Sequence, residues 1–552
     1  MKALSFLARP FAHPPIRLGI LPRRLIAGQS SSRRRRVGAI MALCTSVQVK
    51  DRIELTEKER KIFDRLLQVL RHFDLKTELR VAGGWVRDKL LSKDCYDIDI
   101  ALDNMLGREF CEKVNEYSVH VGEERQGVGV IQCNPDQSKH LETARMRIFD
   151  MWIDFVNLRS ETYAEHSRIP AMKFGTAEED AYRRDLTINS LFYNINTDTV
   201  EDLTGRGIED LKEGTIATPL PPKATFLDDP LRVLRAIRFG ARFGFRLHEE
   251  LKRAASDDEV KAAVSDKVSK ERIGHEVDLM VSGNQAVKAM TYICDLELFW
   301  TVFGLPEGIA GSVSDDCDRT CVYYMNAASD VLEEIGCSTF SDDQRRLCLY
   351  SALFVPLMAL NYTDSKGKKV PVVNSIFRNS LKLKASDADT VIALHKAAEK
   401  FATSIPFITS DNEAAFQEDD LDVPFSSKKR ICAGLLLMEI KDLWRVALLI
   451  SSLLPPKNNL AKELDVSLSE RVELYRRVEK SVLDMDLENV WKMKRLLDGK
   501  AVMSILGLKH GGPQIGEWQK KLLKWQLAHP CGTFDECADW LRESNAKRLK
   551  CS

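Results

Sequence analysis

The chain has 552 residues, of which 44% are hydrophobic and 29% are charged, a composition typical of soluble globular proteins. Its length predicts several domains rather than one. Lysine and arginine number 81, as do aspartate and glutamate, so the net charge is +0. This balance argues mildly against RNA binding, although a local groove on a neutral protein can be basic. The apolar run that comes nearest to a membrane span covers only residues 446–454, so no membrane-spanning segment is expected.

Cysteine usage and the N-terminus both bear on the compartment. The thirteen cysteines lack CxxC or Cys/His zinc spacing, which favours free thiols in a reducing compartment. Residues 1–45 include the run Arg33–Arg36, and no acidic residue precedes Asp51. Such a segment is typical of a transit peptide, so we expect a mitochondrial protein, or alternatively a plastid one; the other interpretation is a disordered basic arm that touches RNA. Met41 could serve as a second start that makes a cytoplasmic or nuclear form.

The predicted elements change character along the chain. Apolar residues recur at helical spacing in residues 55–73, where Thr56 and Glu59 predict a capping box. Runs with strand character follow at residues 79–82, 96–102, 128–132 and 152–158. After Asp228 helical patterns dominate, separated by turn-rich pieces such as residues 364–369. The sequence therefore predicts an α+β head followed by a long all-α remainder.

A glycine pair marks the first candidate site. Residues 81–88 follow a short predicted strand and open a predicted helix. Gly83 and Gly84 would let the backbone approach a phosphate, with the helix dipole facing the anion. Arg87 could add a charge-assisted contact. Taken alone, this signal is weak, since such a turn is most often only a turn.

Two aspartates in the next predicted strand strengthen that interpretation. Asp97 and Asp99 are two residues apart, so their carboxylates would project side by side while Ile98 and Ile100 face the core. Adjacent carboxylates favour a cation with oxygen ligands, such as Mg²⁺. Asp154, a lone acid in an apolar strand, is expected either as a third catalytic carboxylate or as a residue at the sheet edge.

Residues 183–190 contain a second cluster of polar side chains and are predicted to start a helix. Asp185 and Asn189 are four residues apart and would share one face. Arg183 and Arg184 suit a triphosphate, whereas an acid and an amide suit ribose hydroxyls. The alternative is an ordinary Arg–Asp pair on the surface.

A third cluster lies in residues 228–239, predicted as a helix with proline in its first turn. Asp229 only accepts hydrogen bonds and Arg232 only donates them. Together they match the Watson–Crick edges of cytosine and adenine and mismatch those of uracil and guanine. The alternative is an intrahelical salt bridge worth only tenths of a kcal/mol. Arg235 and Arg238 remain for phosphates or for bracing the pair.

These motifs occur in a fixed order, namely Gly83-Gly84-x-Val86-Arg87-Asp88, Asp97-x-Asp99, Arg183-Arg184-Asp185-x-x-x-Asn189 and Asp229-x-x-Arg232. The order resembles that of the class II tRNA nucleotidyltransferases, the CCA-adding enzymes. Residues 153–159, 163–181, 202–211 and 268–272 are similar to the eukaryotic branch. The resemblance is dense over residues 79–283 and thinner beyond.

The resemblance implies an architecture and a role for each matching residue. The fold would be a polymerase-β-like α+β head with a mixed sheet, followed by an all-α neck, body and tail. The expected boundaries are 50–205 for the head, 206–283 for the neck, 284–430 for the body and 431–552 for a tRNA-binding tail. Asp97 and Asp99 would hold two Mg²⁺ ions. The residues implied in nucleotide binding are Gly84, Arg87, Arg184, Asp185, Asn189, Asp229, Arg232, Arg235 and Arg238.

The implied reaction is template-independent addition of CCA to tRNA that lacks it, from CTP and ATP. A poly(A) polymerase, a CC-adding enzyme or an inert RNA-binding protein on the same fold are the alternatives; the loop at residues 163–181 argues against CC-only addition. The family commonly has glutamate where this chain has Asp228. Residues 511–513 could present backbone N–H groups to RNA or simply join two helices. Basic side chains that could contact tRNA are Lys492, Lys494, Arg495, Lys509, Lys520, Lys521 and Lys524.

Overall fold

The computed structural model describes residues 48–131, 143–162, 171–409, 423–454, 466–508 and 510–551. The chain divides into two units, Met1–Val47 and Gln48–Ser552, and the description below concerns the second. The predicted transit segment, the second start at Met41, residues 163–170 of the predicted loop, and Lys509 lie outside the described residues.

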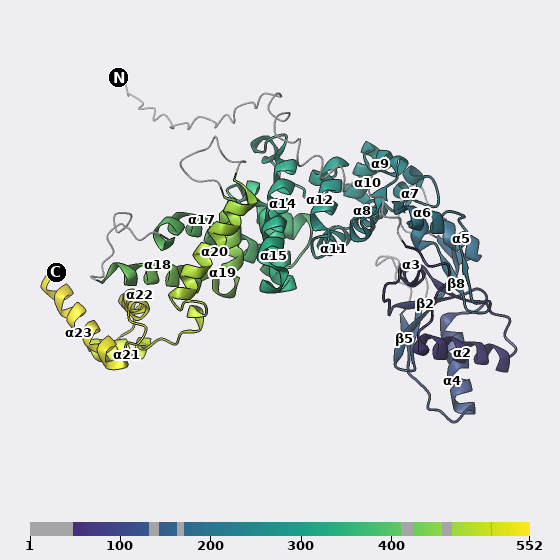
Figure 1. The fold of residues 1–552 in the computed structure, drawn as a ribbon, viewed down its shortest axis with the longest axis horizontal. Helices are drawn as coiled ribbons and strands as arrows, with labels where there is room; N and C mark the ends of the chain where they lie inside the picture. The colour runs from purple at the N-terminus through teal and green to yellow at the C-terminus, as the bar shows by residue number, and fades with distance from the viewer. Residues whose placement is uncertain are drawn as a thin grey trace, which may run out of the picture. The chain divides into compact units, whose positions relative to one another are not determined.

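A seven-stranded mixed sheet forms the head, where Figure 1 labels β2, β5 and β8. Its strand order is β3-β4-β5-β2-β1-β8-β9. Strands β2 and β5 are parallel, with Asp99 opposite Asp154, and the other neighbouring strands are antiparallel. This register brings two acids that are far apart in sequence to one place. The strands are β1 (Leu79–Ala82), β2 (Ile98–Leu102), β3 (Val128–Ile131), β4 (Thr143–Ile148), β5 (Met151–Asn157), β8 (Phe192–Asn194) and β9 (Thr199–Glu201).

Apolar side chains fix the sheet against three helices. Ile98 and Ile100 of β2 are buried, as their alternation with acids predicts. Helix α2 (Glu57–His72) begins at the predicted capping box of Thr56 and Glu59 and packs on α4 (Gly107–His120). Helix α4 in turn packs on β4 and β5. Helix α3 (Gly84–Leu90) starts directly after Gly83, at the end of β1, which pairs with the β2 strand that carries Asp99.

Several short elements lie along the chain between β5 and helix α9. A hairpin of β6 (Arg159–Thr162) and β7 (Ala171–Phe174) leads to α5 (Ala177–Tyr182). A single 3₁₀ turn, η2 (Thr187–Asn189), follows. The next elements are α6 (Gly207–Glu213), β10 (Thr215–Ile216), α7 (Pro222–Asp228), α8 (Leu231–Phe243) and β11 (Arg246–Leu247).

Helices make up almost all of the remaining described chain, with one short hairpin of β12 (Asn361–Thr363) and β13 (Lys369–Pro371). The predicted class, an α+β head with a helical remainder, is confirmed. Among the described helices, none is long and apolar enough to cross a membrane. The helices are α9 (Glu249–Ala255), α10 (Asp258–Lys267), α11 (Lys270–Val281), α12 (Ala286–Asp295), α13 (Phe299–Val302), α14 (Cys317–Ile335), α15 (Asp342–Leu353), α16 (Val372–Ser375), α17 (Ala385–Thr409), α18 (Phe425–Ile440), α19 (Trp444–Leu453), α20 (Leu468–Asp484), α21 (Gly499–Leu506), α22 (Pro513–Ala528) and α23 (Phe534–Cys551).

The local structure differs from the sequence-based prediction at two segments. Residues 183–190 do not start a helix, because the capping box of Thr176 starts α5 upstream and only the turn η2 forms within the segment. Residues 228–239 are not one helix. Asp228 ends α7, Asp229 is extended, and Pro230 caps α8 instead of lying in its first turn. The break places Asp229 in the short connection between α7 and α8, outside both helices.

Candidate active site

Three carboxylates meet at the edge of β2 and β5. Asp97 immediately precedes β2, Asp99 lies within it, and Asp154 lies opposite Asp99 on β5. One oxygen from each of the three side chains lies within 4.8 Å of the other two. The structure thus brings together the predicted pair and the third acid, whose position the sequence left open.

The surroundings of these acids disfavour three negative charges. Burial, together with the charges of Asp97 and Asp154, raises the pKa of Asp99 to about 6. Burial also raises the pKa of Asp154, against the opposing effect of Arg145. Asp154 Oδ1 lies 3.0 Å from Arg145 Nε, but it is buried and accepts no hydrogen bond from the described residues. This set of hard oxygen donors fits a divalent cation such as Mg²⁺, which would offset the repulsion.

The glycine turn lies against Arg184. Gly83 has a φ of +69°, a conformation that residues other than glycine rarely adopt, so the turn favours glycine at this position. A Cβ there would lie 2.7 Å from Nη1 at the tip of Arg184, which shows how closely that side chain approaches the turn. Arg184 Nη1 also donates to the carbonyl of Asn189 at 3.3 Å. The predicted phosphate-binding turn and the predicted arginine therefore form one surface, although they lie a hundred residues apart in the sequence.

Arg87 lies behind that surface rather than on it. Its side chain is buried, with Nε donating to Asp88 at 2.8 Å and Nη1 donating to the side-chain oxygen of Asn189. The guanidinium also stacks 4.7 Å from the ring centre of Phe243 in α8. In this arrangement Arg87 positions Asn189 and braces α3 against α8.

A buried carboxylate holds both arginines of the second motif. Asp180 in α5 accepts hydrogen bonds from Arg183 Nε at 2.9 Å and from Arg184 Nη2 at 2.7 Å. Burial acts to raise the pKa of Asp180, but Arg184 and Arg183 outweigh it and lower the pKa. Asp180 thus fixes both arginines, which orders their side chains before any anion binds.

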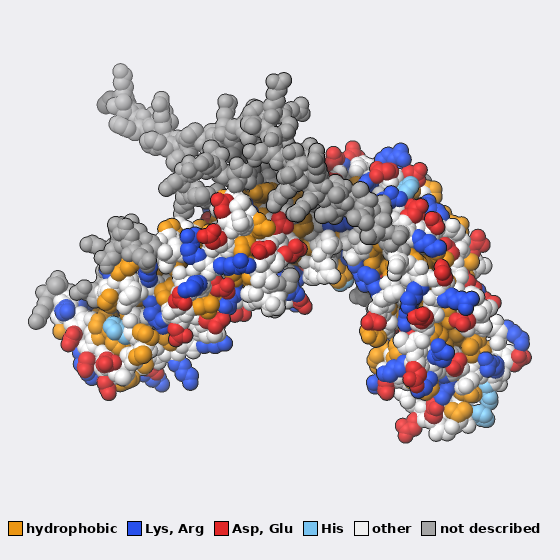
Figure 2. All heavy atoms as spheres, viewed as in Figure 1, with side chains coloured by type: hydrophobic (Ala, Val, Ile, Leu, Met, Phe, Trp, Pro, Cys, Tyr) orange, Lys and Arg blue, Asp and Glu red, His pale blue; other side chains and the backbone are white. Residues whose placement is uncertain are grey.

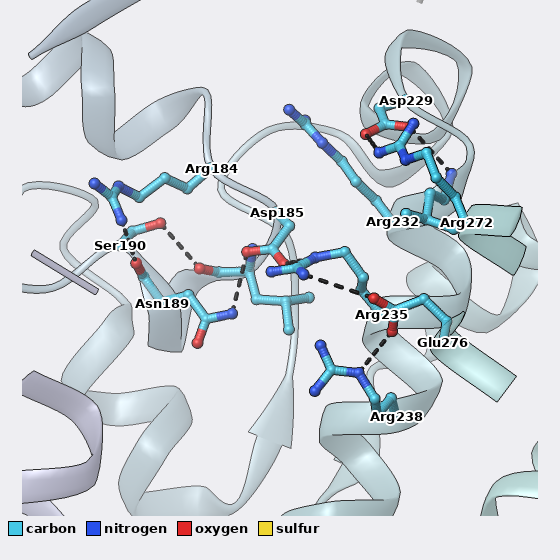
Figure 3. A network of polar contacts seen from close by, with 12 residues as sticks. Arg184, Asp185, Asn189, Ser190, Asp229, Arg232, Arg235, Arg238, Arg272 and Glu276 are labelled. Carbon is cyan, nitrogen blue, oxygen red and sulfur yellow. Dashed lines mark hydrogen bonds and ion pairs between the residues drawn. The ribbon is translucent and has the colours of Figure 1, made fainter. Parts of the chain in front are cut away.

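A chain of hydrogen bonds and ion pairs runs from the second motif to the third (Figure 3). Asn189 Nδ2 donates to Asp185 Oδ1 at 3.1 Å, and Arg235 Nε donates to Asp185 Oδ2 at 2.7 Å. Glu276 in α11 accepts from Arg238 Nε at 2.6 Å and lies 3.8 Å from Arg235. Arg235 therefore links Asp185 of the second motif to Glu276 of α11, and Arg238 pairs with the same glutamate.

The predicted base-reading pair is split between two partners. Arg272 Nη2 donates to Asp229 Oδ2 at 3.0 Å, so the carboxylate is held from α11 (Figure 3). Arg232 is mostly buried and donates to the backbone carbonyl of Arg183 at 2.8 Å. Asp229 and Arg232 remain neighbours, because the Arg232 backbone N–H donates to the Asp229 carbonyl at 3.0 Å. The side-chain ion pair of Asp229 with Arg272 thus comes from another helix, α11.

Three residues of this site had no role in the sequence-based prediction: Asp180, Arg272 and Glu276. Spacing gives a signal for each. Asp180 lies three and four residues before the two arginines at the end of α5, and Arg272 and Glu276 lie four apart on one face of α11. Charge spacing on helices adjacent to a motif could therefore have identified them.

Comparison with known proteins agrees with this geometry. Residues 79–217 match the family described as the poly A polymerase head domain. A tRNA nucleotidyltransferase of Schizosaccharomyces pombe is 33% identical over 89% of this chain and 99% of its own length. The chain belongs to the tRNA nucleotidyltransferase family. A mitochondrial CCA tRNA nucleotidyltransferase of Saccharomyces cerevisiae is 34% identical over 85% of this chain and 89% of its own length.

Solved structures agree on the fold of this tRNA nucleotidyltransferase. The CCA-adding enzyme of Bacillus stearothermophilus in complex with CTP aligns with a TM-score of 0.60 at 19% identity, covering 90% of this chain and 100% of its own. The head alone is shared more widely, since poly(A) polymerase I of Escherichia coli is 35% identical over only 24% of this chain and 27% of its own. The family predicted from the motifs is confirmed, and the protein is an enzyme.

Proposed function

We propose that this enzyme adds CCA to the 3′ end of tRNA that lacks it, using CTP and ATP. The observation that carries the proposal is the cluster of Asp97, Asp99 and Asp154, whose oxygens lie within 4.8 Å of one another at the end of the motif network. Whole-length similarity to enzymes named for CCA addition favours this specificity over poly(A) or CC-only addition, because the head alone is shared with other activities.

The carboxylates would bind Mg²⁺, with Asp97 and Asp99 holding two ions and Asp154 completing the acidic set. Bound divalent ions supply charge neutralisation at the reacting phosphate and lower the pKa of the attacking hydroxyl. The tRNA 3′-oxygen forms a bond to the α-phosphorus of the nucleotide, and the bond to pyrophosphate breaks. The chain's own contribution is alignment of the two reactants.

The remaining motif residues would hold and read the nucleotide. Gly84 and Arg184 would contact the triphosphate. Arg87 would fix the glycine turn and hold the side chain of Asn189. Asp185 would face the ribose. Asp229 and Arg232 would read the base edge and accept only cytosine and adenine, and Arg235 and Arg238 would hold the motif through Asp185 and Glu276.

The helical remainder would bind tRNA, with the neck at 206–283, the body at 284–430 and the tail at 431–552. Gly512 caps and Pro513 opens α22, so this turn joins two helices, and its position at a helix start is compatible with a phosphate contact. We further propose a mitochondrial enzyme with residues 1–45 as transit peptide; relatives from two yeasts are named as mitochondrial.

Primer extension tests the proposed function. Purified protein, Mg²⁺ and tRNA transcripts without CCA are combined with each labelled nucleotide alone and then with CTP and ATP together. Growth to a complete CCA end only with both nucleotides is expected. A long tail from ATP alone would instead identify a poly(A) polymerase, and arrest after two cytidines a CC-adding enzyme.

The matched variants are Asp97→Ala and Asp64→Ala. Asp64 is an exposed acid of α2 in the same head. Asp97→Ala is expected to lower kcat/KM by about 1,000-fold or more, on the scale of losing a charge-stabilising group in a closed site, while tRNA affinity stays. Equal activity of the two variants would overturn the assignment of the acidic cluster.

A further inference from the structure

Two large aromatic side chains lie exposed beside the acidic cluster. Tyr96 is 78% exposed and directly precedes Asp97. Trp152 is 52% exposed and lies two residues before Asp154 in β5. The side chains of Trp152 and Asp154 therefore project from the same face of the sheet. A tryptophan and a tyrosine this open to water, next to charged groups, point to a ligand with flat apolar surfaces.

Arg145 connects the aromatic pair to the acids. It lies opposite Asp154 in the β4–β5 register and forms an ion pair with it at 3.0 Å. Its guanidinium also lies 5.5 Å from the ring centre of Trp152. One side chain therefore contacts both the acidic cluster and the indole, which makes the aromatic surface continuous with the site of the reaction.

A cleft of about 660 Å³ opens between these side chains, within the size range of small-molecule binding sites. Tyr96, Trp152 and Arg145 line it, together with the apolar side chain of Met151. Acids also line it, among them Asp94. The cations Lys58 and Lys89 line it as well. Cations can contact the phosphates of a nucleic acid strand while aromatic rings stack on its bases, so the lining suits single-stranded nucleic acid.

We propose that this cleft binds the unpaired 3′-terminal nucleotides of the RNA primer, whose bases stack on Trp152 and Tyr96. The proposal rests on the proposed function and adds the primer side of the same reaction. The attacking hydroxyl must reach the acidic cluster, and the cleft adjoins that cluster through Tyr96, which precedes Asp97, and through Arg145, which pairs with Asp154. Stacking on aromatic rings tolerates any base, which suits a primer end that changes after every addition.

The test compares Trp152→Ala and Tyr96→Ala with Phe149→Ala in the full-length protein. Phe149 is also an exposed aromatic with an arginine against its ring, Arg65, but it does not line the cleft. With RNA ending in CC and with ATP, the two cleft variants are expected to raise the KM for RNA by about 5- to 100-fold. The KM for ATP stays unchanged, Trp152→Phe restores most of the loss, and Phe149→Ala behaves as wild type.

A second comparison removes the base instead of the ring. An RNA with an abasic 3′-terminal residue is expected to weaken binding by the wild type but not to weaken Trp152→Ala any further. A 2-aminopurine at that position, bound without nucleotide, should be quenched by the wild type and not by Trp152→Ala. Equal behaviour of all proteins in both measurements would overturn the proposal. Because the fluorescence needs no catalysis, failure of the wild type to extend RNA would count against the proposed function alone.

Discussion

The charged side chains of the site are held by partners from other elements. Asp185 is paired with Arg235 of α8, and Asp229 is paired with Arg272 of α11. Each of these two acids would contact the nucleotide, and each is oriented by an arginine that would not contact the nucleotide itself. Fixing an acceptor before the substrate arrives reduces the ordering cost of binding.

Asp185 should make stability depend on pH in the acid range. Burial alone would raise its pKa, but Arg235 and Asn189 lower it to about 2. A lowered pKa stabilises the fold above the unfolded value of 3.8 and loses this effect as pH falls toward 2. Asp185→Asn is expected to cost about 2 kcal/mol at neutral pH.

Thermal unfolding at several pH values measures that effect. The gap in Tm between the wild type and Asp185→Asn should be largest at neutral pH and should shrink below about pH 4. Asp64→Asn, at an exposed position of α2, serves as the control and should show no such trend. A gap for Asp185→Asn that stays constant down to about pH 3 would contradict the pairing with Arg235.

Arg272 should control base discrimination without touching the base. Arg272→Ala removes the group that orients the Asp229 carboxylate at 3.0 Å. The ratio of kcat/KM for CTP over UTP is expected to fall about 10-fold, equivalent to one charge-assisted hydrogen bond. Arg253→Ala, an exposed arginine of α9, should leave the ratio unchanged. An unaltered ratio for Arg272→Ala would mean that Asp229 keeps its orientation alone.

Residue positions were predictable from the sequence where one element fixes them. The adjacency of Asp97 and Asp99 follows from the two-residue period of a strand, and the structure has it. The burial of Arg87 was not predictable, because Phe243 and Asn189 reach it from distant parts of the chain. The partner of Asp229 depends in the same way on how α11 packs against α8.

At the scale of elements, close packing constrains where glycine is needed. Helix α11 carries both Arg272 and Glu276, and its position is set in part by Gly274. A Cβ at Gly274 would lie 1.7 Å from the carbonyl oxygen of Leu381. No side-chain adjustment relieves a clash with backbone, so α11 would have to move, and the two charged residues would move with it.

Gly274→Ala should therefore destabilise the protein and Gly516→Ala should not. Overpacking typically costs about 1–3 kcal/mol. Gly516 lies inside α22 with open space around it, so alanine there should stabilise by roughly 0.5–1 kcal/mol. Urea unfolding of both variants measures the difference. Equal shifts would contradict the close approach of α11 to Leu381.

Elements fixed by local sequence were predicted better than elements that depend on packing. The capping box at Thr56 and the strand at 79–82 were predicted correctly, since local spacing and β-type composition decide them. The break at Asp229 and the turn at 187–189 were not, because an extended Asp229 and a single 3₁₀ turn depend on packing between α7, α8 and the head. The predicted helix at 183–190 was wrong for this reason.

For the whole molecule, the net charge of +0 reflects acidic and basic side chains that are mixed over the surface in view in Figure 2. On the face drawn in Figure 2, acidic and basic side chains are interspersed, and neither sign dominates the described surface in view. The absence of a basic excess in the sequence thus said little about RNA, because binding would use local groups. The arrangement of a head and a helical remainder was predictable, since hydrophobic periodicity changes near Asp228.

A chain that starts at Met41 should keep full activity. The unit Gln48–Ser552 contains all of the site residues described above. CCA addition by residues 41–552 is expected to match the full chain within about two-fold, whereas only the full chain, fused to a fluorescent protein, should enter mitochondria. Import of the shorter chain would contradict the role proposed for residues 1–45.

Asp180 changes how inherited variation in this protein should be interpreted. Its carboxylate holds Arg183 and Arg184 and accepts the Arg159 backbone N–H at 3.2 Å, and the carbonyl of Arg183 in turn receives Arg232. A single substitution at Asp180 would disturb the second and the third motif together. A survey that scores harm by closeness to substrate would rank such an allele as benign, whereas its carriers should resemble those with a defect in the catalytic site itself.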